Sequence, residues 1–110
     1  MAWFNDMNDN TALPLNPNYK EILKLHDMLE AEHIPHELSR FYDGYAVCYL
    51  VSGDVCICDA VEHSCSYGSK EDLIEILGLA KDDSDGVNTE GYLTADEVFQ
   101  RIKKHYESTK

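Results

Sequence analysis

The chain has 110 residues, enough for one domain with a single modest core and too few for two. Nine Lys and Arg residues stand against 21 Asp and Glu residues, which gives a formal net charge of −12. This balance excludes the basic face that a simple nucleic-acid binder needs, and the longest apolar run, residues 45–51, is far short of the roughly 20 residues of a membrane span.

The N-terminal segment is predicted to be a flexible arm. Residues 1–16 are rich in Asn and Asp, and a single α+β domain is expected over residues 17–110. Residues 1–6 lack the basic start and long apolar stretch of a secretory signal. We therefore expect a cytoplasmic protein whose cysteines are reduced.

A first helix is predicted from Asn16 and Pro17, which suit an N-cap and the first helical position. Apolar residues then recur every three or four positions, as in an amphipathic helix that packs on a core. These residues are Tyr19, Ile22, Leu23, Leu25 and Leu29. Pro35 ends the helix because it disfavours helical geometry at Ile34.

Three strands in an antiparallel meander are predicted next, over residues 36–42, 45–51 and 55–61. Asp43-Gly44 suits a type I′ turn between the first two, and Ser52-Gly53-Asp54 forms the second turn.

Side chains along a strand point alternately to its two faces, and both faces of the second and third predicted strands are apolar. The small face contains Ala46, Cys48, Leu50, Cys56, Cys58 and Ala60. The bulky face contains Tyr45, Val47, Tyr49, Val51, Val55, Ile57 and Val61, interrupted by Asp59. A sheet with one solvated side should show polar residues there, so we expect something to cover the bulky face. The alternatives are the arm with Trp3 and Phe4, a second copy of the chain, or a partner that contacts Tyr45, Val47, Tyr49 and Ile57.

Two helices are predicted to complete an α-β-β-β-α-α order. Ser69 and Asp72 have the spacing of a capping pair, and the helix they open ends near Gly78. Residues 81–91 are read as an acidic loop, and Thr94 and Glu97 form a capping box for the last helix. Val98, Phe99, Ile102 and Tyr106 are expected to face inward along it.

Residues 86–97 resemble an EF-hand calcium loop. Asn88, Glu90 and Glu97 fall at ligand positions and Gly91 at the turn, but Gly86 stands where an Asp ligand is required. Helix capping by Thr94 and Glu97 explains the same residues, so the sequence leaves calcium binding open.

The cysteines do not predict a catalytic or metal site. Cys56 and Cys58, followed by His63 and Cys65, lack the C-x₂₋₄-C spacing of structural zinc sites and are read as core residues. His63 and Cys65 are too close in sequence for the usual thiol–base pair. The five histidines are scattered and read mostly as surface or helix-end residues. We therefore expect no enzyme activity, metal or cofactor.

Three segments carry a resemblance to a known group of proteins: Val61–Ser69, Leu73–Leu79 and Leu93–Tyr106. Over about residues 17–107 the chain resembles small uncharacterised proteins of phages and prophages of Firmicutes. Its size, acidity and predicted element order are also similar to phage anti-CRISPR proteins that imitate DNA. The resemblance implies a bacterial host cytoplasm and a host protein as partner.

Three functions follow as expectations. The first is a phage-type inhibitor that competes with nucleic acid for a basic groove on a host protein. Its acidic surface would comprise Asp82, Asp83, Asp85, Glu90, Asp96 and Glu97. The second is a small-molecule binder, such as a sponge for a nucleotide defence signal, in which a helix N-terminus holds an anion. Its ligand loop would comprise His63, Ser66, Tyr67, Gly68 and Ser69. The third is a phage structural or dimerisation module.

Overall fold

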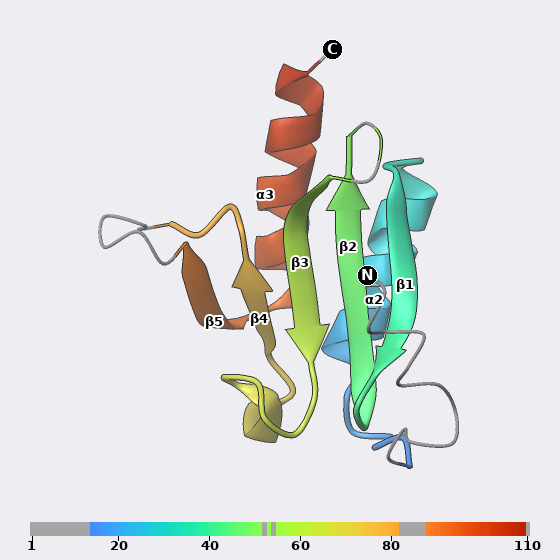
Figure 1. The fold of residues 1–110 in the computed structure, drawn as a ribbon, viewed down its shortest axis with the longest axis vertical. Coiled ribbons are helices and arrows are strands. Elements are labelled where there is room, and N and C mark those ends of the chain that lie inside the picture. The colour runs from blue at the N-terminus through green and yellow to red at the C-terminus, as the bar shows by residue number, and fades with distance from the viewer. Residues whose placement is uncertain (1–13, 52, 54, 82–87, 110) are drawn as a thin grey trace.

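The computed structural model describes residues 14–51, 53, 55–81 and 88–109. They form an α+β fold with a five-stranded antiparallel sheet (Figure 1). The elements are helix α2 (Glu21–Ala31), strands β1 (His36–Phe41), β2 (Gly44–Leu50), β3 (Cys56–Glu62), β4 (Ile74–Leu77) and β5 (Thr89–Leu93), and helix α3 (Ala95–Ser108). Neighbours in sequence are neighbours in the sheet. The α+β class is confirmed, whereas the predicted α-β-β-β-α-α order is wrong. No described helix is long and apolar enough to cross a membrane.

Helix α2 packs as its periodicity predicts, with Ile22, Leu25 and Leu29 fully buried. Its predicted start is wrong, because Asn16 and Pro17 form a turn in which Asn16 Oδ1 accepts from the Asn18 N–H at 2.9 Å. The helix begins four residues after Pro17 and has no side-chain cap of its own at Lys20. It ends at Ala31, before Pro35 can act on it. Its N-terminal donors are met by other parts of the chain, described below.

The segment predicted as a second helix forms a strand instead. Ser69–Glu71 is a single 3₁₀ turn, and β4 follows between β3 and β5. Left-handed backbone at Asp72 (φ 57°) and Gly78 (φ 99°) bounds the strand and interrupts any helix. Ile74 and Ile76 alternate into the core, as a strand places them. The predicted Ser69–Asp72 capping pair is therefore absent, and part of the predicted loop 81–91 is β5.

The β1–β2 hairpin turns one residue earlier than predicted. Phe41 pairs with Gly44, so the turn residues are Tyr42 and Asp43. Only Tyr42 of these two has positive φ, 54°, which excludes the predicted type I′ turn. Gly44 is the first residue of β2, where glycine fits because a Cβ would overlap the carbonyl oxygen of Glu62 on β3.

The register of the sheet corrects the predicted faces. Tyr45, Val47 and Tyr49 pair with Glu62, Ala60 and Cys58, so both sets share one face. In Figure 1 both helices lie behind this sheet, and α2 and α3 contact each other and the strands. Val47 and Tyr49 are fully buried in the resulting core, and they are not available to a second copy or a partner. The core comprises Ile22, Leu25, Leu29, Ile34, Val47, Tyr49, Cys58, Ala60, Ile74, Ile76, Leu93, Ala95, Val98, Phe99 and Ile102.

Helix α3 begins with the predicted capping box. The Glu97 N–H donates to Thr94 Oγ1 at 3.2 Å, and the Thr94 N–H donates to Glu97 Oε1 at 2.9 Å. Val98, Phe99 and Ile102 are buried and Tyr106 is partly buried, as predicted. The predicted arm over residues 1–16 lies almost entirely outside the described residues.

Candidate docking surface and other candidate sites

The face of the sheet that the described helices leave uncovered is acidic and partly apolar. Pairing aligns Glu37 on β1, Cys48 on β2, Asp59 on β3 and Leu77 on β4 in one row across it. Glu75 lies in the next row, and Leu77 keeps 58% of its surface exposed. We call Glu37, Asp59, Glu75 and Leu77 the outer-face patch.

The described strands place no Lys or Arg on this face. Arg40 is the one Lys or Arg in the five described strands. It is opposite Tyr45 on the helix side of the sheet, with its guanidinium carbon 5.9 Å from the centre of that ring. The outer-face patch therefore presents negative charge beside exposed apolar surface, without an internal counter-charge on the strands.

The acidic surface predicted from residues 82–97 is largely engaged in internal contacts where the structure describes it. Asp82, Asp83 and Asp85 lie outside the described residues. Asp96 is exposed, and Glu97 is held in the capping box. Glu90 accepts two hydrogen bonds from Arg101, at 2.7 and 3.0 Å, and a third from the Lys81 N–H at 2.8 Å. The Arg101 hydrogen bonds lower the pKa of Glu90 to about 2.

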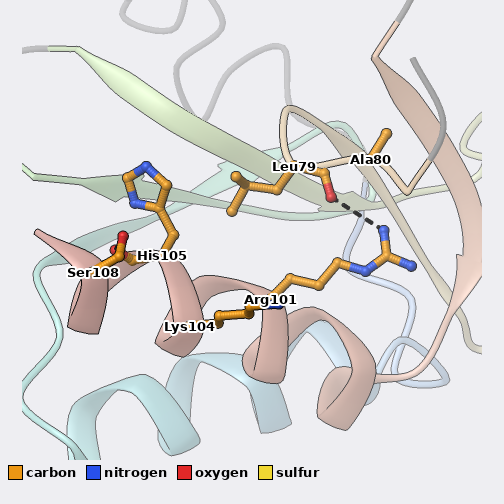
Figure 2. Close-up of a pocket in the computed structure, with 6 residues that line it drawn as sticks. All are labelled: Leu79, Ala80, Arg101, Lys104, His105 and Ser108. Atoms are coloured by element: carbon orange, nitrogen blue, oxygen red, sulfur yellow. Dashed lines mark hydrogen bonds between the residues drawn. The ribbon is translucent and has the colours of Figure 1, made fainter. Parts of the chain in front are cut away.

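A hollow between α3 and the segment after β4 is lined by three basic side chains, Arg101, Lys104 and His105. Leu79, Ala80, Arg101, Lys104, His105 and Ser108 line it (Figure 2). Arg101 donates to the Leu79 carbonyl oxygen at 3.2 Å, drawn as the dashed line in Figure 2. Glu90 neutralises Arg101, and the His105 Nδ1 meets the Tyr49 hydroxyl at 2.9 Å, so two of the three basic side chains that line the hollow are already engaged.

The predicted ligand loop uses its polar groups internally. Ser66 Oγ accepts from the His63 N–H at 3.0 Å and donates to the His63 carbonyl at 2.8 Å. The His63 ring is buried against Phe41, and burial lowers its pKa. Ser69 is also buried, and the turn that it opens has three residues instead of the predicted helix. The helix N-terminus on which the expected anion site depended is therefore absent from this loop, although Ser66, Tyr67, Gly68 and Ser69 line one hollow.

An open hollow does lie on the outer side of that loop. Tyr67 and Tyr92 line it with 64% and 59% of their surfaces exposed, together with Gly68, Lys70 and Glu71. The Tyr67 N–H donates to Glu75 Oε1 at 2.8 Å, which joins the hollow to the outer-face patch.

Two carboxyl groups, the partly buried Asp72 and the buried Glu62, hold the first turn of α2 in place. Asp72 Oδ1 accepts from the N–H groups of Lys20 and Glu21, at 2.8 and 3.1 Å, and so caps α2. Glu62 Oε1 accepts from the Ile22 N–H at 3.2 Å. Burial, and secondly the Asp72 carboxyl beside it, raise the pKa of Glu62 to about 9. Glu62 is therefore protonated at neutral pH, and this cluster is structural.

The cysteines differ from the sequence prediction. Cys48 and Cys56 form a disulfide across β2 and β3, so the expectation of four reduced thiols is wrong for this pair. Cys58 is a core residue, as predicted, and burial raises the pKa of its thiol to about 12. Cys56 is exposed, which contradicts its predicted core role, and Cys65 is also exposed.

The near-EF-hand segment does not form a helix–loop–helix in its described part. Residues 88–97 run through β5 into α3. Asn88 Oδ1 accepts from the Ala80 N–H at 3.0 Å, while Glu90 binds Arg101 and Glu97 caps α3. The side-chain oxygens that would have to bind calcium are therefore already engaged in contacts within the protein.

Sequence reasoning missed one cluster of polar side chains, formed by His26, Glu30 and His36. His26 and Glu30 are four residues apart on α2, a spacing that puts them on one helix face and that the sequence displays. His36 joins them only because β1 folds back beside the end of α2.

Comparison of the chain with protein-family models, curated proteins and solved structures found no match. The likeness to phage and prophage proteins stays a prediction from the sequence segments quoted above.

Proposed function

We propose that this protein is a non-enzymatic acidic binding protein of the phage type, which inhibits a host nucleic-acid-handling or defence protein. The observation that supports the proposal is the outer-face patch, where Glu37, Asp59 and Glu75 share one face with Leu77 and the described strands place no Lys or Arg on it. With a formal net charge of −12, the molecule would be drawn to a basic groove by long-range attraction.

The patch has the mixed character that protein interfaces use. Carboxylates give complementarity to a basic partner and fast, salt-sensitive association. Exposed Leu77 adds apolar area whose burial contributes affinity that salt does not screen. The binding surface in this proposal therefore lies on the sheet, instead of the segment 82–97 on which the sequence prediction rested.

The experiment is affinity capture of partners from a nuclease-treated Firmicutes lysate, with salt elution and mass spectrometry. The test variant is Glu37→Lys with Leu77→Lys, which reverses one charge of the patch and adds a positive charge at a second exposed position. The control variant is Gln100→Lys with Glu107→Lys on exposed positions of α3. Both variants change the formal net charge by the same amount, so they separate the patch from overall charge.

We expect a basic, nucleic-acid-binding protein to be captured by the wild type and the control, released by salt, and lost with the test variant. Nucleic acid added back should compete with the chain for that partner. Equal loss with both variants would attribute binding to net charge alone and refute the role of the patch. Failure to capture any partner with folded bait would refute the inhibitor proposal.

A further inference from the structure

We infer that His26, Glu30 and His36 form a binding site for one Zn²⁺ ion. Their ligand atoms all lie within 4.8 Å of one another. His26 Nδ1 is 2.8 Å from His36 Nε2, and Glu30 Oε2 is 3.5 Å from the same His36 nitrogen. The site lies on the helix side of the molecule and is independent of the outer-face patch.

The tautomer of His36 is fixed in the form that binds metal. His36 Nδ1 lies 2.7 Å from the Ile34 carbonyl oxygen, which can only accept, so Nδ1 carries the ring proton. The lone pair of His36 is therefore on Nε2, the atom that faces His26 and Glu30. A carbonyl that orients the second nitrogen of a histidine is the usual outer-shell partner at zinc sites.

The backbone holds this arrangement rigidly. After α2, His33 takes left-handed backbone (φ 57°), the Ile34 N–H donates to the Leu29 carbonyl at 3.0 Å, and the His33 N–H donates to the Glu30 carbonyl at 3.1 Å. These bonds make a Schellman ending, which turns the chain back over the last turn of the helix. The His36 side chain is consequently 2% exposed, while Glu30 keeps 66% of its side chain in solvent.

The donor set selects zinc among the common cations. Two imidazole nitrogens and one carboxylate oxygen are suited to Zn²⁺, whereas Mg²⁺ and Ca²⁺ prefer oxygen ligands alone. With bonds of about 2.0–2.1 Å, tetrahedral ligands are about 3.3 Å apart, so the Glu30–His36 distance already fits. The two nitrogens must separate by about 0.5 Å, which a rotation of half-buried His26 on its helix supplies.

Without metal, the two imidazoles share one hydrogen bond, in which His26 Nδ1–H donates to His36 Nε2. Zinc binding replaces that bond, and His26 then holds its proton on Nε2. Three protein ligands leave a fourth position for water on the solvent side, where Glu30 is exposed.

The test is titration of the full chain with Zn²⁺ alone after treatment with a chelator, by calorimetry and thermal melting, without reductant so that the Cys48–Cys56 disulfide stays closed. We expect one equivalent to bind and to raise the melting temperature, and Mg²⁺ to do neither. Glu30→Gln and His26→Gln, both at solvent-accessible positions, should weaken binding about 10-fold and about 100-fold. Circular dichroism will verify that each variant is folded.

Two control variants sharpen the result. Asp27→Asn removes a neighbouring exposed carboxylate, and His33→Asn removes a neighbouring imidazole at a left-handed position that Asn tolerates. Both should bind Zn²⁺ as the wild type does. Co²⁺ in place of Zn²⁺ should give tetrahedral d–d absorption without a thiolate charge-transfer band. Absence of binding, binding that survives His26→Gln, or a thiolate band from Cys58 or Cys65 would overturn the inference.

Discussion

Glu62 predicts an unusual dependence of stability on pH. Its folded-state pKa is about 9, whereas an ordinary Glu, as in the unfolded chain, titrates near 4.5. Between these values the folded protein holds a proton that the unfolded chain releases, so unfolding becomes easier as pH rises. The contribution of Glu62 to the free energy of unfolding should fall by about 1.4 kcal/mol per pH unit, or about 4 kcal/mol between pH 5 and 8.

Glu62→Gln isolates this contribution. Glutamine keeps an oxygen that can accept from the Ile22 N–H, but it cannot ionise. We expect wild type and variant to be of similar stability near pH 5, and the variant to become progressively more stable than the wild type towards pH 8. Equilibrium unfolding in urea at four pH values measures the difference in the free energy of unfolding between wild type and variant. The contributions of the other titrating groups are common to both proteins and largely cancel in this difference.

The matched control is Glu71→Gln, which removes one exposed carboxylate and changes the formal charge equally. Its stability difference from the wild type should be flat over the same pH range. A flat difference for Glu62→Gln as well would show that Glu62 ionises normally in the folded protein, and the reasoning from its burial would be refuted.

Three further changes test the contacts that hold the sheet. Reducing the disulfide between Cys48 and Cys56, which are eight residues apart, should lower the free energy of unfolding by about 2.5 kcal/mol in urea titrations, and reductant should not affect Cys48→Ala. Glu90→Gln should cost about 1–3 kcal/mol at pH 7 because it breaks the paired bonds to Arg101. That loss should shrink as pH falls from 4.5 towards 2, where Glu90 in the folded wild type is also protonated, and an unchanged loss at pH 2 would contradict the ion pair. Gly44→Ala should cost about 3 kcal/mol because its Cβ would overlap the Glu62 carbonyl; a loss under about 1 kcal/mol in the same titrations would refute that contact.

The sequence predicted best what short stretches determine by themselves. The capping box of Thr94 and Glu97 depends on four consecutive residues, and it forms as predicted. The apolar spacing of α2 likewise depends only on its own helix. The prediction for residues 74–77 is wrong because Leu73, Ile76 and Leu77 also fit a helical period, and only the pairing with β3 and β5 decides for a strand.

The candidate sites depend on contacts between residues that are distant in the sequence, and the spacing of residues along the chain does not predict such contacts. The outer-face patch requires the register that pairs Cys48 with Asp59, which the β2–β3 connection and an irregularity at Leu50 set. The two predicted faces were mixed for the same reason. His36 reaches His26 only because the chain turns back after α2. The raised pKa of Glu62 follows from its burial by residues distant in the sequence.

Residues distant in the sequence accept hydrogen bonds from the N-terminal N–H groups of both helices, and this affects the order of folding during synthesis. Asp72 lies 52 residues after the Lys20 N–H that it caps, and Glu21 accepts at 2.8 Å from the N–H of Ala95, 74 residues later. Helix α2 therefore leaves the ribosome long before the carboxylate that completes its first turn, and it stays marginal until the 3₁₀ turn has emerged. Helix α2 in turn supplies an acceptor to α3. The bond between Glu21 and Ala95 can form only after translation has passed β5, so the two helices are joined after the sheet has been synthesised.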